Sequence, residues 1–202
     1  MLNVGFYAHP QVLSSRFSVF IHLRSRHAPR AAFLRCPSKG LAEIGIDCAR
    51  VEHVILSHFH YDHVGNYALF PNATFYVQDT EMSFYTGRYV QHAAFRRSII
   101  DGEQEILPGI RVHKVGGQTD GMQIITVQTK EGRAVVASDA SHYYHNIEKN
   151  VPFLTLHDIP GMYYGFQRIR ALADKPELII PGHDPLVQER LHRVANGIVS
   201  LG

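Results

Sequence analysis

The alternation of apolar and polar positions along this chain predicts a mixed α+β protein built largely from short strands. Several short runs are rich in β-branched and other apolar residues and are bounded by turn residues, as expected for strands buried in a sheet. These predicted strands are residues 51–56, 73–77, 110–115, 122–127, 133–138 and 178–182. The Lys-Glu-Gly segment at 130–132 is expected to join two of them into a hairpin.

Capping residues and helical periodicity predict helices between these strands. Ser38 can cap a short helix over 38–46, and Asp79 can cap a second one. The second helix would carry an apolar stripe that we expect to pack in the core, with a substrate pocket as the alternative: Met82, Phe84, Tyr85, Tyr89 and Phe95. Residues 161–173 have apolar positions at helical spacing, and 184–199 are expected to form the closing helix.

The composition is typical of one globular domain and excludes several function classes. Of the 202 residues, 45% are hydrophobic and 19% are charged. The net charge of +2 does not indicate nucleic-acid binding, and no apolar run approaches the roughly 18 residues of a membrane span. Cys36 and Cys48 lack the C-x-x-C spacing and are interpreted as ordinary thiols of a reducing compartment. We therefore expect a cytoplasmic protein that binds neither nucleic acid nor membranes.

The strongest chemical signal is the segment SHFHYDHVGN at 57–66, which directly follows a predicted strand. In an extended segment His58 and His60 point to the same side, and a turn brings Asp62 and His63 round to face them. Neutral imidazoles and a carboxylate that converge in this way suit a divalent ion such as zinc. A histidine-rich polar loop is the alternative. We favour metal binding, because burying these groups unpaired would cost free energy.

The spacing His-x-His-x-Asp-His over 58–63 resembles the signature of the metallo-β-lactamase superfamily. The resemblance implies a four-layer αββα sandwich with a one- or two-metal site on one edge. It also implies two further ligands at the ends of predicted strands, Asp139 as the bridging carboxylate and His183 as the last metal histidine. A rigid sheet would then hold the site while loops complete it.

One position departs from the family pattern. Aligning the glycine-containing loop at 117–123 with the family places Gln118 where the family carries a third histidine for the first metal. A glutamine oxygen is a weaker zinc ligand than imidazole, and His113 is not expected to substitute because it lies inside a predicted strand. The first ion would bind His58, His60, Gln118 and Asp139, and the second Asp62, His63, Asp139 and His183. A dinuclear site with a weak first ion and a mononuclear second site both stay open.

The amino-terminal segment differs in composition from the rest of the chain. No acidic residue precedes Glu43, while arginine and serine are frequent. An organellar transit peptide has this composition, but a basic leader, or a first strand at 17–23, is the favoured interpretation. We assign 1–35 to a basic leader of uncertain structure and 36–202 to a metallo-β-lactamase-like hydrolase domain, as the resemblance implies. The family's Asp-Thr-Gly tripeptide is missing, so the amino-terminal layer is expected to be shortened or replaced.

The resemblance also implies a reaction. Two divalent ions can hold a hydroxide near neutral pH, and Asp62 would move a proton onto the leaving group. The chain between residues 34 and 185 is most similar to the N-acyl homoserine lactonase-like group, which implies that water opens a lactone ring. Lactonases of this group usually carry a tyrosine three residues after the bridging aspartate, where this chain has His142. Two alternatives stay open: a degenerate, non-catalytic member of the fold, motivated by Gln118, and a thioesterase or other ester hydrolase.

Overall fold

The structure is a computed structural model. It describes residues 3–8, 20–22, 37–84, 88, 90, 94–195 and 197–201, the first two ranges by their backbone only. The helices in this part of the chain are α1 (Pro37–Glu43), α2 (Tyr61–Val64), α3 (Asp79–Ser83), α4 (Tyr144–Lys149), α5 (Ile159–Leu172) and α6 (Val187–Arg190). None of the helices described is long and apolar enough to cross a membrane.

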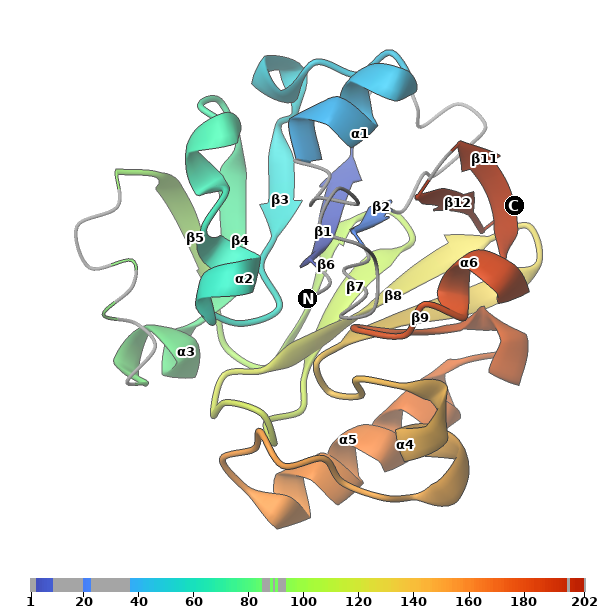
Figure 1. Ribbon diagram of the computed structural model, residues 1–202. Helices are drawn as coiled ribbons and strands as arrows, with labels where there is room; N and C mark the ends of the chain where they lie inside the picture. The colour runs from blue at the N-terminus through green and yellow to red at the C-terminus, as the bar shows by residue number, and fades with distance from the viewer. Residues whose placement is uncertain are drawn as a thin grey trace.

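Two five-stranded sheets form the centre of the molecule (Figure 1). The first has the order β2-β1-β3-β4-β5: β2 (Phe20–His22), β1 (Asn3–Ala8), β3 (His53–Ile55), β4 (Thr74–Gln78) and β5 (Arg96–Ile100). The second has the order β10-β9-β8-β7-β6: β10 (Ile179–Pro181), β9 (Gly132–Ser138), β8 (Gln123–Thr129), β7 (Ile110–Lys114) and β6 (Glu103–Leu107). Strands β3, β4 and β5 are parallel, β6 to β9 are antiparallel, and β10 is parallel to β9.

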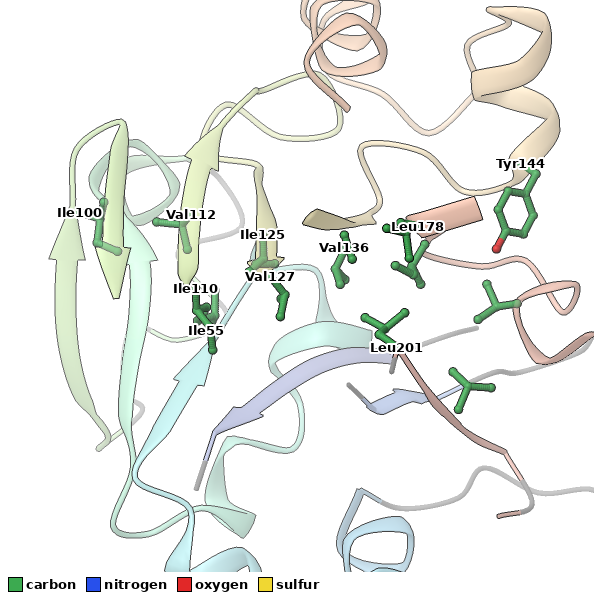
Figure 2. Close-up of a cluster of buried hydrophobic side chains, with 14 residues drawn as sticks. Ile55, Ile100, Ile110, Val112, Ile125, Val127, Val136, Tyr144, Leu178 and Leu201 are labelled. Atoms are coloured by element: carbon green, nitrogen blue, oxygen red, sulfur yellow. The ribbon is translucent and has the colours of Figure 1, made fainter. Parts of the chain in front are cut away.

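Strands β3 and β4 of the first sheet and β8 and β9 of the second contribute side chains to cores on both faces, as in a four-layer αββα sandwich. Figure 2 shows the core between the sheets, to which β3 contributes Ile55 and β9 contributes Val136. On the outer face of the first sheet, Leu41 of α1 packs in a second core. On the outer face of the second sheet, Phe166 of α5 packs with Val135 in a third core. Neighbouring residues of a central strand, such as Val135 and Val136 of β9, face opposite cores. The sequences of these strands are therefore continuous apolar runs.

The predicted closing helix over 184–199 is wrong. Among the residues described in that range only α6 is helical, and the chain then forms an antiparallel hairpin of β11 (His192–Ala195) and β12 (Ile198–Ser200). The β-branched pair Ile198 and Val199 is buried, and Gly197 turns the hairpin with φ = 74°, a conformation that glycine adopts without strain. Local turn chemistry therefore decides against a helix here.

Two further parts of the chain differ from expectation. Strands β5 and β6 were not predicted; they are joined by a turn at Gly102, where φ is 82°, and they belong to different sheets. The helix that begins at Asp79 is α3, and it ends at Ser83 because Phe84 is extended. Tyr85 and Tyr89 of the expected aromatic stripe lie outside the described residues.

Two strands occur within the segment assigned to the leader. The backbone of β1 pairs antiparallel with β3 and with β2, and β2 falls inside the 17–23 strand alternative. Most of the residues on which the transit-peptide interpretation rests lie outside the described ranges. Cys36 also lies outside them.

The third core gives a first prediction. Replacing Phe166, which is 0% exposed, by alanine should lower the free energy of unfolding by about 3–5 kcal/mol, because it leaves a cavity between α5 and the second sheet. Equilibrium unfolding in urea measures the change. The control is Gln167→Ala, an exposed position on the same helix, which should stay within about 0.5 kcal/mol. Equal effects of the two substitutions would contradict this packing.

Candidate metal centre

The first candidate residues lie where β3 ends and the chain turns into α2. His58 is fully buried, and His60 is half-buried just before the helix. The carbonyl oxygen of His60 accepts hydrogen bonds from the backbone N–H groups of His63 (2.9 Å) and Val64 (3.1 Å). This turn brings the ring of His63 to a centroid distance of 4.2 Å from that of His58. The imidazole of His58, before the turn, and that of His63, within α2, therefore lie next to each other.

Asp139 lies at the centre of the cluster. It follows the end of β9 and is 2% exposed. Its Oδ1 lies 2.8 Å from His183 Nε2 and 3.5 Å from His63 Nε2. Its Oδ2 lies 3.1 Å from His142 Nε2 and 3.9 Å from His58 Nε2. Imidazoles from loops far apart in the sequence thus surround one carboxylate.

Three overlapping sets of side chains offer ligand atoms that lie within 4.8 Å of one another. The sets are His58, His63 and Asp139; Asp62, His63 and His183; and Asp139, His142 and His183. Five of the six histidine and aspartate ligands expected from the sequence occur in these sets. The sixth, His60, lies beside them, with Nδ1 2.9 Å from His58 Nε2. His142 was not expected as a ligand, although it stands three residues after Asp139.

The side chain of Gln118 contacts both His60 and Asp139. Its amide Nε2 lies 3.1 Å from His60 Nδ1 and donates a 3.2 Å hydrogen bond to Asp139 Oδ2. The structure thus places Gln118 beside the expected first-metal residues. His113 is directed elsewhere: its ring contacts Glu103 (3.1 Å) and Thr126 (3.1 Å) of the neighbouring strands.

The electrostatics of the cluster favour a bound cation. Burial opposes ionisation of Asp139, but the nearby His63 and hydrogen bonds from His142 and His183 hold the pKa of its carboxyl well below the usual value. Burial, reinforced by His63, holds the pKa of His58 well below its usual value, so this imidazole is neutral. Burial also lowers the pKa of His63, but the carboxylates of Asp139 and Asp62 outweigh it and raise that pKa. A buried anion beside a neutral imidazole is a suitable environment for a divalent ion.

Unsatisfied polar atoms provide an independent test of whether the residues fit a metal ion. His63 Nε2, Asp139 Oδ1 and Gln118 Oε1 are buried, and among the described residues none of them has a partner in hydrogen-bond geometry, although Asp139 Oδ1 lies 2.8 Å from His183 Nε2 and 3.5 Å from His63 Nε2. Leaving one such atom unpaired costs about 1–3 kcal/mol. All three are potential metal ligands in one cluster, so the donor set fits a divalent cation.

Hydroxyl groups behind the imidazoles orient their rings. Ser138 Oγ donates a 2.9 Å hydrogen bond to Ser57 Oγ, which in turn contacts Nδ1 of His58 (3.1 Å) and Nδ1 of His63 (3.4 Å). With both Nδ1 atoms engaged by one serine, the Nε2 atoms face Asp139. Such outer contacts commonly fix the ring orientation of metal-binding histidines.

Glu81 is a supporting residue that sequence reasoning missed. Its side chain is 1% exposed and joins the histidine loop to the glycine-rich loop that carries Gln118. Oε1 accepts a 2.8 Å hydrogen bond from the backbone N–H of Phe59. Oε2 accepts hydrogen bonds from the hydroxyl of Thr119 (2.6 Å) and the backbone N–H of Gly121 (3.1 Å). No local pattern marks it, because a glutamate in the first turn of a helix is ordinarily exposed.

Gly182 lets the last loop approach the central carboxylate. A Cβ atom at this position would lie 2.5 Å from Asp139 Oδ1 and 2.6 Å from the backbone carbonyl of Ser138. Backbone hydrogen bonds from Gly182 to Ser141 (2.9 Å) and from His183 to His142 (2.8 Å) join the loops that follow β9 and β10. His183 therefore reaches the cluster through a close backbone contact that only glycine permits.

An αββα sandwich with a histidine and aspartate cluster at the strand ends defines a class of metal-dependent hydrolases. The sequence model of the metallo-beta-lactamase superfamily matches residues 25–183, and the chain belongs to this superfamily.

Known members of the superfamily resemble the chain closely enough to compare. It is 29% identical over 161 residues to an N-acyl homoserine lactonase of Bacillus thuringiensis subsp. kurstaki, covering 76% of this chain and 64% of the relative. It is 32% identical over 149 residues to a probable metallo-hydrolase of Methanocaldococcus jannaschii, covering 74% of this chain and 64% of the relative. The aligned part of the chain thus spans less than two thirds of the length of these relatives.

A solved structure shows the same similarity in three dimensions. It is an N-acyl homoserine lactone hydrolase with the product N-hexanoyl-L-homoserine bound at its catalytic metal centre. The TM-score is 0.69 at 25% identity, and the alignment covers 80% of this chain and 67% of that one.

The contacts of Glu81 give a second prediction. Glu81→Gln should lower the free energy of unfolding by about 1–3 kcal/mol, because the amide replaces one acceptor oxygen by an NH₂ group that faces other donors. Thermal or urea unfolding measures this change in the free energy of unfolding. The control Glu52→Gln, at an exposed position, should change it by less than about 0.5 kcal/mol. A neutral effect at position 81 would show that the two loops do not depend on this carboxylate.

Proposed function

We propose that this protein is a metal-dependent hydrolase that opens the ring of a lactone of the N-acyl homoserine lactone type. The observation that carries the proposal is the convergence of imidazoles from the 58–63, 142 and 183 positions on the buried Asp139 carboxylate. The lactonase relatives and the product-bound structure support this substrate class. A small lactone or ester is therefore the proposed partner.

The residues present would hold two divalent ions, with zinc as the proposed metal. The first ion would bind His58, His60, Gln118 and Asp139, and the second Asp62, His63, Asp139 and His183. When bound, such ions supply Lewis acidity toward a carbonyl oxygen and lower the pKa of water to near neutrality. Burial lowers the pKa of His58, and the surrounding imidazoles outweigh burial and lower the pKa of Asp139, so both groups are shifted toward the protonation state that a metal ligand needs.

Asp62 is proposed as the catalytic residue. Its carboxylate lies 3.5 Å from His63 Nε2, and its side chain is 11% exposed, so it reaches both the cluster and entering water. As water adds to the lactone carbonyl and the ring C–O bond breaks, this carboxylate would take the proton from water and deliver it to the ring oxygen. The product is the open-chain hydroxy acid, and Asp62 returns to its ionised form.

A direct test joins metal content to turnover. The protein purified with zinc or manganese should bind metal and hydrolyse N-hexanoyl homoserine lactone, as followed by acid release at constant pH. Asp139→Asn should lower turnover by more than about 100-fold, because it removes the carboxylate shared by both sides. The control Asp101→Asn, at an exposed position, should leave it unchanged.

The outcomes of this test separate the candidate functions. Hydrolysis of thioesters with lactones untouched would replace the lactonase proposal with a thioesterase. Failure of the protein to bind metal would overturn the metal-dependent mechanism.

Gln118 favours a second candidate, a non-catalytic member of the fold. Gln118→His would place an imidazole beside His60 and Asp139, so it should raise the zinc content from about one to about two ions per chain. Elemental analysis and lactone hydrolysis measure the effect, with Gln128→His at an exposed position as the control. Restored activity in an inactive protein would establish the non-catalytic candidate. Two ions bound tightly by the unaltered chain, with turnover, would exclude it.

A further inference from the structure

We propose that His142 is a direct ligand of the ion held by Asp62, His63, Asp139 and His183, so that the chain holds one ion much more tightly than the other. The inference rests on the proposed metal-dependent function and adds to it a ligand that the sequence signature does not contain.

The first support is distance. Asp139 Oδ2 lies 3.1 Å from His142 Nε2 and 3.0 Å from His183 Nε2. Ligands bound about 2.0–2.1 Å from zinc are separated by roughly 2.8–3.4 Å when they are neighbours in an octahedral or tetrahedral shell. Both separations match this range, so the two imidazoles could share an ion with Asp139 after little movement.

The second support is that the ring of His142 is held in place. It stacks on Phe153 with a centroid distance of 3.6 Å and an interplanar angle of 15°, and its side chain is 17% exposed. Its backbone carbonyl accepts the 2.8 Å hydrogen bond from His183, and the two imidazole centroids lie 4.5 Å apart. The two histidines therefore approach Asp139 as one preorganised pair.

The third support is the unequal distribution of donors. With His142, the second side would have imidazoles from 63, 142 and 183 and carboxylates from 62 and 139. The first side would have His58, His60 and the neutral amide of Gln118, with Asp139 shared. Imidazole is a better zinc ligand than an amide oxygen, and the additional carboxylate balances the charge of a divalent ion. The site that contains His142 should therefore bind zinc before the site that contains Gln118 does.

The test measures metal binding separately from turnover. X-ray absorption of the unaltered protein carrying one zinc per chain should show about three imidazoles at the ion, and His142→Ala should show about two. Competition with a chelator should give a zinc affinity lowered more than about 100-fold in His142→Ala, beyond the 10–100-fold typical of losing an outer contact. His145→Ala, an exposed histidine on α4, should keep the original affinity.

Each outcome has a definite meaning. Two imidazoles in the unaltered protein, or unchanged affinity in His142→Ala together with slower lactone hydrolysis, would overturn His142 as a ligand while leaving the proposed function intact. No zinc binding by the unaltered protein would overturn both. The spectrum of the unaltered protein keeps the test valid even if the variant folds poorly.

Discussion

The structure of the candidate site depends on one buried carboxylate. Asp139 is 2% exposed and has imidazole nitrogens within 4 Å from the loops that follow β3, β9 and β10. An ionised carboxylate is costly to bury unless positive charge or strong hydrogen-bond donors surround it. The imidazoles meet this requirement only in part, because Asp139 Oδ1, although it lies 2.8 Å from His183 Nε2, has no partner in hydrogen-bond geometry among the described residues. A divalent cation would supply the remaining positive charge. The buried Asp139 carboxylate, which is costly for folding by itself, would then be stabilised as a metal ligand.

The sandwich supplies the rigidity that this arrangement needs. Strands β8 and β9 are apolar on both faces, and side chains such as Val135 and Val136 anchor them in cores on opposite sides. The loops beyond them are then joined by specific contacts: Glu81 connects the histidine loop to the glycine-rich loop, and Gly182 allows the last loop to touch Ser138. Apolar packing thus positions the strand ends, while a few polar contacts position the side chains.

The parts of the fold that were predictable from sequence are those where local pattern and buried environment agree. The apolar runs that became β3, β4, β7, β8 and β9 have this property, and the histidine segment is recognisable because several metal-binding residue types share one turn. The juxtaposition of the 58–63 loop with Asp139 and His183 is observed, while their role as ligands stays a prediction. The helix predicted over 184–199 was wrong because the apolar spacing there is ambiguous between helix and strand. The positive φ of Gly197 instead fits the turn of a hairpin. Glu81 and His142 acquire meaning only from tertiary contacts, which single-residue patterns do not encode.

The two sides of the cluster also differ in charge, and this difference affects the chemistry that each can support. The side that contains Asp62 has two carboxylates when the shared Asp139 is included, whereas the side that contains Gln118 has Asp139 alone. Attraction between a dication and a carboxylate is weakly screened in a buried environment, so the charge difference reinforces the difference in ligand type. The proton transfer proposed for Asp62 would then take place on the side of the cluster that has more carboxylate and imidazole groups. Gln118 lies on the other side of the cluster, where the proposed site would offer a second ion a neutral amide in place of an imidazole.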